Sequence, residues 1–160
     1  MAGCAPGLPS RRSWSRSGET NVYFYSSALV KLLVLGETNA DVAVELFRSA
    51  DRRSTSVIAY AECRAAVAAA ARSRRLTGSE ARKAVAALND VWPALDRLAV
   101  SEEIVHRAGE LAERRALRGF DAIHLASALA QAPDAALACW DDQLAKAARA
   151  EGIGLATIKK

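Results

Sequence analysis

Short apolar runs alternate along the chain with longer segments whose apolar residues recur at helical spacing. The short runs predict strands at 22–25, 55–57, 98–100, 135–140 and 153–158. The longer segments predict helices at 28–35, 40–50, 58–72, 78–96, 101–114, 122–130 and 142–151. Gly36 and Gly152 lie where two of these helices should end, and Pro93 should kink or end a third.

This alternation of short strands and helices is typical of an α/β fold. Strands that are apolar along their whole length indicate a parallel sheet with helices on both faces, so we predict a three-layer α/β/α sandwich with a short parallel sheet. In such a sheet, ligands bind beyond the carboxyl ends of the strands. We therefore expect the functional site at that edge.

Residues 1–21 show neither the helical nor the strand period. They are rich in Gly, Pro, Ser and Arg, which predicts a disordered N-terminal extension followed by one folded domain at 22–160. No apolar segment follows their basic residues, which argues against a signal peptide. One hypothesis is that the natural start of the protein lies near Val22.

The composition of this 160-residue chain suits one globular domain. The net charge of +4, of which residues 1–21 contribute +2, is compatible with a nucleic-acid substrate without demanding one. Three widely spaced cysteines argue against a disulfide framework or a zinc site, so we expect Cys63 and Cys139 to be buried thiols in a cytoplasmic protein. No apolar run approaches the roughly 20 residues that span a bilayer, so we expect no membrane contact.

Three carboxylates stand out because each lies where an apolar element meets a helix. Glu62 occurs in AYAECRAA, Asp121 in RGFDAIHLASAL and Asp141, followed by Asp142, in LACWDDQLAKAA. The predicted topology can bring the three segments to one edge of the sheet. Carboxylates that converge from distant segments commonly hold Mg²⁺ or Mn²⁺ for phosphodiester cleavage.

The same acids also have plainer interpretations. An Asp at a helix start is more often a cap than a metal ligand, which applies to Asp121 and to Asp141 or its neighbour. Glu62 is different, since a carboxylate on an otherwise apolar helix face needs another reason to be there. We interpret His124 as a structural histidine, and Arg118 as close enough to Asp121 in sequence to contact a substrate backbone.

Four segments, in this order and at these spacings, resemble the PIN domain, and specifically its VapC toxin branch: VYFYSSALVKLL, TSVIAYAECRAA, LRGFDAIHLASAL and ACWDDQLAKAARAEGI. The resemblance implies an endoribonuclease dependent on Mg²⁺ or Mn²⁺, the toxin of a toxin–antitoxin pair. It also implies a homodimer and an antitoxin peptide laid across the active site. Carried over residue by residue, it implies catalytic and metal-binding roles for Glu62, Asp121 and Asp141, with Ser27 and Asp142 in support.

The chain departs from the family pattern at the first acid. Where the family has Asp at the end of the first strand, this sequence has Tyr25, followed by Ser26 and Ser27. The phenol of Tyr has a pKa near 10. It is therefore neutral at pH 7, is bulkier than a carboxylate and is a weak ligand for a hard cation. We expect cleavage to be severely impaired, and our hypothesis is that Tyr25 is an acquired inactivating change in an otherwise intact toxin.

Two rival interpretations stay open at this point. The first is a catalytically dead PIN-like module that binds antitoxin without cleaving RNA, which Tyr25 favours and the three retained acids oppose. The second is an α/β domain whose acids are simply helix caps. The RNA target stays open as well, since PIN toxins of similar fold cut tRNA, rRNA or mRNA.

Overall fold

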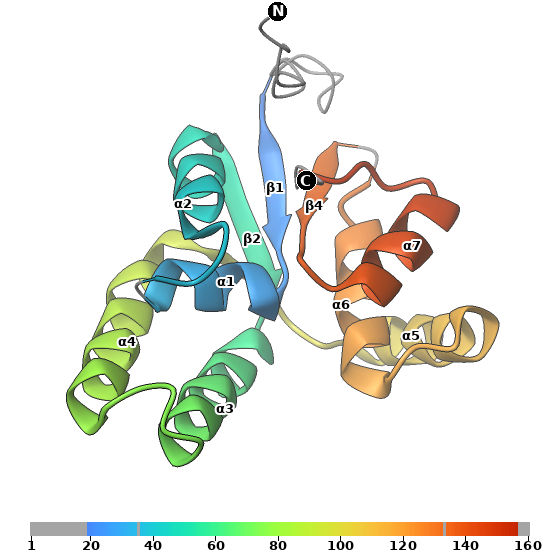
Figure 1. Ribbon diagram of the computed structural model, residues 1–160. Coiled ribbons are helices and arrows are strands. Elements are labelled where there is room, and N and C mark those ends of the chain that lie inside the picture. Colours follow the sequence, from blue (N-terminus) through green and yellow to red (C-terminus); the bar gives the residue numbers. More distant parts are fainter. Residues whose placement is uncertain (1–18, 35, 133, 157–160) are drawn as a thin grey trace, which may run out of the picture.

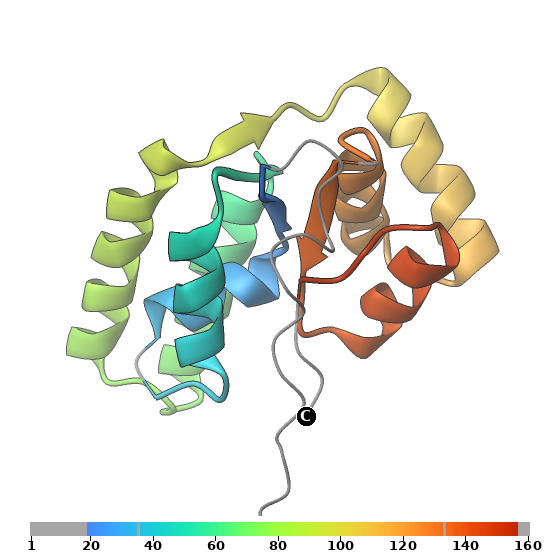
Figure 2. The same ribbon diagram turned by 90° about the horizontal axis from the view of Figure 1, so that it is seen from above.

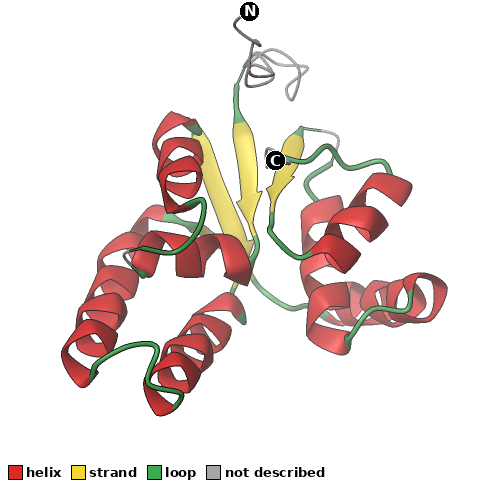
Figure 3. Cartoon of the chain, viewed as in Figure 1, coloured by secondary structure: helices red, strands yellow, loops and turns green. Residues whose placement is uncertain are grey.

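The structure is a computed structural model that describes residues 19–34, 36–132 and 134–156. Strands β1 (Asn21–Phe24), β2 (Arg52–Ser56), β3 (Asp96–Leu98) and β4 (Ala135–Ala138) form one parallel sheet. Helices alternate with these strands, as Figure 3 shows. They are α1 (Ser26–Leu33), α2 (Ala40–Ser49), α3 (Ala59–Arg72), α4 (Gly78–Val91), α5 (Glu102–Arg115), α6 (Gly119–Leu129), α7 (Asp142–Ala150) and the 3₁₀ turn η2 (Trp92–Ala94).

The side chains of strand β1 and of Tyr25, which follows it, alternate between two hydrophobic cores. Val22 and Phe24 pack with residues of α1 to α4, and Tyr23 and Tyr25 pack with residues of α5 to α7. Since successive side chains of a strand point to opposite faces, this division places one group of helices on each face of the sheet. Figures 1 and 2 show the same two groups on either side of the strands. The predicted α/β/α sandwich is confirmed.

The order of the strands, β3-β2-β1-β4, defines where a ligand can bind. From β1 the chain first adds β2 on one side and later β4 on the other, so the crevice between β1 and β4 is a topological switch point. At its carboxyl end, the amide N–H of Tyr25 donates to the carbonyl of Ala138 at 3.0 Å. Tyr25 therefore lies directly at the mouth of this crevice.

The predicted final strand at 153–158 is wrong over the residues that the structure describes. Leu155 makes only an isolated bridge to Leu137 on β4, where Leu137 donates to Gly154 and Ala156 donates to Leu137, both at 2.8 Å. Gly152 ends α7 with a φ of +85°, and the chain then touches the edge of the sheet too briefly to form a strand. Residues 157 and 158 of that prediction lie outside the described residues.

The N-terminal boundary falls slightly before the predicted one. Thr20 is buried, its carbonyl accepts a hydrogen bond from Asp51 at 2.8 Å, and Asn21 already belongs to β1. Residues 1–18 of the predicted disordered extension lie outside the described residues, so for them it stays a prediction. In the described ranges, every helix is too short or too polar to cross a membrane.

Candidate active site

The three predicted acids come from helices that start beyond the carboxyl edge of the sheet. Glu62 lies in the first turn of α3, Asp121 lies in the first turn of α6, and Asp141 is the N-cap of α7. Figure 1 shows that α3 and α7 begin where the arrowheads of β2 and β4 end. A cavity of about 390 Å³ opens beside two of them, lined by Tyr25, Glu62, Arg118, Gly119, Phe120 and Asp121.

Arg118 connects the acids of α6 and α7. Its guanidinium lies 2.7 Å from Asp121 Oδ2 and 3.8 Å from Asp141 Oδ2, while its side chain is 76% exposed. The hydrogen bond and the charge of Asp121 raise the pKa of Arg118 further above its ordinary value. The site therefore carries a permanent cation at its solvent-facing rim, where it can meet a phosphate.

Tyr25 makes direct contact with the most buried of the three acids. Its hydroxyl donates to Asp121 Oδ1 at 2.6 Å, and Asp121 is only 6% exposed. Burial, followed by the hydrogen bond and the negative charge of Asp121, raises the pKa of Tyr25 above its ordinary value, so the phenol stays protonated. Since Arg118 binds the other oxygen, both oxygens of Asp121 have protein partners.

Glu62 is held from a different direction. Ser26 Oγ donates to its Oε2 at 2.5 Å, and His124 Nε2 lies 2.5 Å from the same oxygen. Burial alone would raise the pKa of Glu62, but the hydrogen bond and charge of His124 and the hydrogen bond from Ser26 outweigh it and lower the pKa. Glu62 is therefore ionised at neutral pH. Sequence reasoning missed Ser26 and this contact of His124; the signal was a His inside the apolar stripe of α6.

The remaining predicted residues have structural contacts. Asp141 Oδ1 accepts a hydrogen bond from the amide of Leu144 at 2.8 Å, which confirms its N-cap interpretation. Ser27 Oγ accepts a hydrogen bond from the amide of Trp140 at 3.0 Å and thereby ties α1 to the segment before α7. Asp142 is exposed at the first position of α7.

The acids suit a divalent cation in chemistry but not in arrangement. Their donors are all carboxylate oxygens, which Mg²⁺ and Mn²⁺ prefer. Yet among the described residues no three Asp, Glu, His or Cys side chains lie close enough together to hold a metal ion. At Asp121, Tyr25 and Arg118 each bind one of the two oxygens, so a metal ion would have to compete with both.

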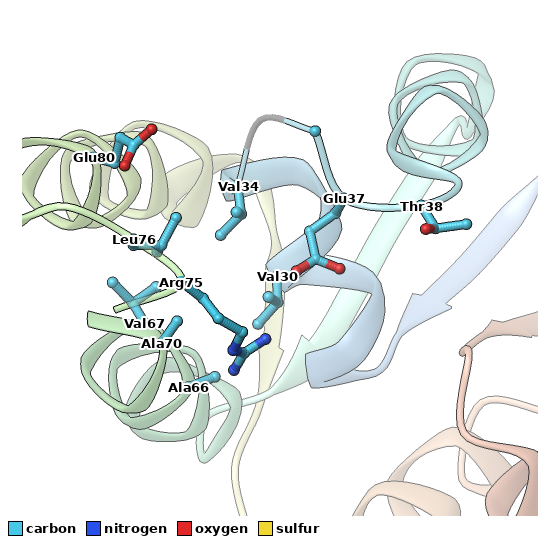
Figure 4. A pocket seen from close by; sticks show the side chains of 11 residues that line it. Val30, Val34, Glu37, Thr38, Ala66, Val67, Ala70, Arg75, Leu76 and Glu80 are labelled. Carbon is cyan, nitrogen blue, oxygen red and sulfur yellow. The ribbon is translucent and has the colours of Figure 1, made fainter. Parts of the chain in front are cut away.

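A second cavity, of about 350 Å³, lies between α1, α3 and the segment that leads into α4 (Figure 4). Val30, Val34, Val67 and Leu76 form the apolar part of its walls, and Figure 4 shows the guanidinium of Arg75 beside them. None of the three predicted acids lines it. This cavity is therefore separate from the predicted site.

Comparison with known proteins first defines the class of this chain, because a family model of the PIN domain matches residues 22–150. Ribonuclease VapC49 of Mycobacterium tuberculosis H37Rv is 44% identical over 136 residues, which are 84% of this chain and 94% of the relative. Ribonuclease VapC46 of the same strain is 34% identical over 135 residues, 84% of this chain and 95% of that one. The chain therefore belongs to the PIN-domain family, within its VapC ribonuclease branch.

Two solved structures share the fold. A toxin–antitoxin complex from Klebsiella pneumoniae aligns with a TM-score of 0.51 and 21% identity, over 76% of this chain and 87% of that one. VapBC2 from Rickettsia felis, bound to a DNA fragment from its promoter, aligns with a TM-score of 0.59 and 17% identity. The second alignment covers 85% of this chain and 97% of the other. The predicted PIN-like fold is confirmed by both.

Proposed function

We propose that this chain is an endoribonuclease toxin of a toxin–antitoxin pair whose cleavage activity is impaired by Tyr25. The names of its relatives and the position of Glu62, Asp121 and Asp141 at the carboxyl edge support the ribonuclease assignment. The observation that carries the impairment is the hydrogen bond of 2.6 Å from Tyr25 to Asp121. Together with the contact from Arg118, this bond engages both oxygens of Asp121, so a metal ion would have to compete for them.

In a chain with Asp in place of Tyr25, this Asp together with Glu62, Asp121 and Asp141 would hold Mg²⁺ or Mn²⁺. Such an ion would lower the pKa of a water molecule and neutralise charge on the scissile phosphate. Arg118 contributes a fixed positive charge at the rim and binds the phosphate backbone of the substrate. Tyr25 opposes metal binding in two ways, since it brings no negative charge and its ring fills the space that a carboxylate would leave.

The partners we propose are a cognate antitoxin, an RNA substrate and a second copy of this chain, in the cytoplasm. Support for the antitoxin comes from the two structural neighbours, which are toxin–antitoxin complexes. Coexpression with the product of the neighbouring gene, followed by light scattering, tests both assemblies. A monomer that captures no neighbouring product would contradict the proposal.

Cleavage of RNA by three matched proteins tests the impairment: the chain as it stands, Tyr25→Asp and Tyr25→Phe. The substrates are tRNA, rRNA and mRNA transcripts with Mn²⁺. We expect only Tyr25→Asp to cut, with EDTA abolishing the cleavage. Tyr25→Phe is the control, because it removes the hydroxyl without restoring a carboxylate. Equal cleavage by the chain as it stands would show that the three remaining acids suffice.

A second candidate function is an antitoxin-binding module without nuclease activity, and the bond between Tyr25 and Asp121 favours it. The two functions differ in what the Tyr25→Asp variant does. If this variant binds antitoxin but neither binds Mn²⁺ nor cuts RNA, the module is correct. If it binds Mn²⁺ and cuts, the chain derives from a working nuclease.

A further inference from the structure

We propose that His124 is a positioning residue of this site: anchored by Tyr23, it donates from Nε2 to Glu62 and fixes the orientation of that carboxylate. The geometry of this contact stands independently of the proposed function. Only its consequence for metal binding rests on that function.

The contact joins four elements of the fold in a buried hydrogen-bonded chain. His124 on α6 is 0% exposed, and its Nδ1 lies 2.8 Å from the hydroxyl of Tyr23 on β1. On its other side, Nε2 lies 2.5 Å from Oε2 of Glu62 on α3 and 3.1 Å from Oγ of Ser26 on α1. The imidazole therefore links the sheet to the acid from a fully buried position.

The chemistry of the partners gives the chain of hydrogen bonds a direction. The carboxylate of Glu62 is ionised and can only accept hydrogen bonds. The nitrogen that faces it at 2.5 Å, Nε2, therefore carries a hydrogen, while Nδ1 shares a hydrogen bond with the hydroxyl of Tyr23. That hydrogen points to Glu62 Oε2, which Ser26 also binds. Within the described part of the chain Oε1 has no such partner, which leaves it available to a ligand.

A packing role alone does not account for this arrangement. A buried polar pair costs desolvation energy that a Leu at position 124 would avoid. Carboxylates that bind metals, in contrast, need partners that hold them in one orientation, and these partners act without touching the metal. The ring of Tyr25 stands edge-on to the imidazole, with centroids 4.8 Å apart and planes at 89°. Tyr25, which stands where the family has its first acid, therefore packs directly against His124, the residue that orients Glu62.

The ¹⁵N spectrum of the imidazole tests the geometry in the chain as it stands, without metal or RNA. The exposed His106 provides the second histidine signal, which a His106→Gln variant assigns. We expect Nε2 of His124 to carry a hydrogen, and the Nδ1 signal to change in Tyr23→Phe, which removes the partner of that nitrogen. An Nε2 without a hydrogen would overturn the proposed donation to Glu62.

The consequence for metal binding is tested by the Mn²⁺ affinity of Tyr25→Asp, alone and combined with His124→Gln or His124→Leu. The amide of Gln can donate to Glu62 from near the place of Nε2, whereas Leu cannot donate. We expect His124→Leu to weaken Mn²⁺ binding about 10–100-fold, the usual effect of losing such a partner, and His124→Gln to retain most of it.

Thermal melts show whether each variant is folded. A folded variant with both Tyr25→Asp and His124→Leu that binds Mn²⁺ as tightly as Tyr25→Asp alone would refute a positioning role. Equal losses of Mn²⁺ affinity on adding His124→Leu or His124→Gln would refute it as well. If the variant with His124→Leu does not fold, the Mn²⁺ affinity of the His124→Gln variant and the ¹⁵N spectrum decide whether His124 positions Glu62. If Tyr25→Asp itself binds no Mn²⁺, the proposed metal-dependent function fails, and the spectrum still decides on the role of His124.

Discussion

Replacing Tyr25 by Asp should make the stability of the protein depend on metal. Tyr25→Asp removes a hydrogen bond to a charged acceptor, which contributes about 1.5–3 kcal/mol. It also adds a fourth carboxylate beside Asp121, Glu62 and Asp141, whose charges already act on the phenol. In EDTA we therefore expect the variant to be less stable than the chain as it stands by about 2 kcal/mol or more.

Metal binding should reverse this loss. A ligand present at about 100 times its dissociation constant stabilises the folded state by about 2.7 kcal/mol. For a chain of this length each kcal/mol corresponds to about 2–4 °C in Tm, so we expect Mn²⁺ to raise the Tm of Tyr25→Asp by roughly 5–11 °C. The chain as it stands should keep its Tm, because Tyr25 and Arg118 occupy the oxygens of Asp121.

Differential scanning calorimetry of the two proteins in EDTA and in Mn²⁺ measures both effects. Tyr25→Phe serves as the matched control, since it loses the same hydroxyl without gaining a ligand, and its Tm should not respond to Mn²⁺. An equal response of all three proteins would place the metal elsewhere. A Tyr25→Asp variant as stable as the chain as it stands in EDTA would refute the repulsion argument.

Three further outcomes follow from the surroundings of other residues. Burial raises the pKa of Cys63 and of Cys139 to about 12, so both should resist alkylation at pH 8 until denaturant is added, as peptide mass spectrometry can show. The lowered pKa of Glu62 means that its stabilising effect is present above its ordinary pKa and is lost as pH falls through the lowered value. The urea midpoints of the chain as it stands and of Glu62→Gln should thus differ at neutral pH and converge in acid; a constant difference would contradict this. Adding Arg118→Gln to Tyr25→Asp should strengthen Mn²⁺ binding in calorimetric titrations, because the guanidinium competes for Asp121, and weaker binding would count against that competition.

The hydrophobic pattern predicted the fold where strands are apolar and failed where they are not. VYF and AALA are recognisable as strands; VYF belongs to the inner strand β1, and AALA is the strand β4 that pairs with it. Strand β2 has the sequence RRSTS, and its polar first residues did not predict a strand. Thr55, later in the same strand, is polar and yet fully buried. Its hydroxyl donates to the carbonyl of Phe24 at 2.8 Å, a long-range partner that satisfies the polar group and that no local pattern contains.

Prediction of the site from the sequence met the same limit, because the partners of its residues are distant along the chain. Glu62 was predictable because a carboxylate on an apolar helix face needs a partner, but the partner itself, His124, is 62 residues away. Asp141 combined two roles that the sequence presented as alternatives, since it caps α7 through one oxygen and faces Arg118 with the other. The contact of Tyr25 with Asp121 depends on tertiary packing across 96 residues, which spacing along the chain does not encode.

The order of the strands also has a consequence for biosynthesis. Strand β1 leaves the ribosome before β2, β3 and β4, yet one of its two neighbours is β4, and Tyr23 pairs with Leu137. The sheet therefore stays incomplete until β4 has been translated. Asp141 follows β4 directly, so the acidic centre is assembled only after that moment. A nascent chain, or one terminated before α7, therefore lacks the complete acidic centre.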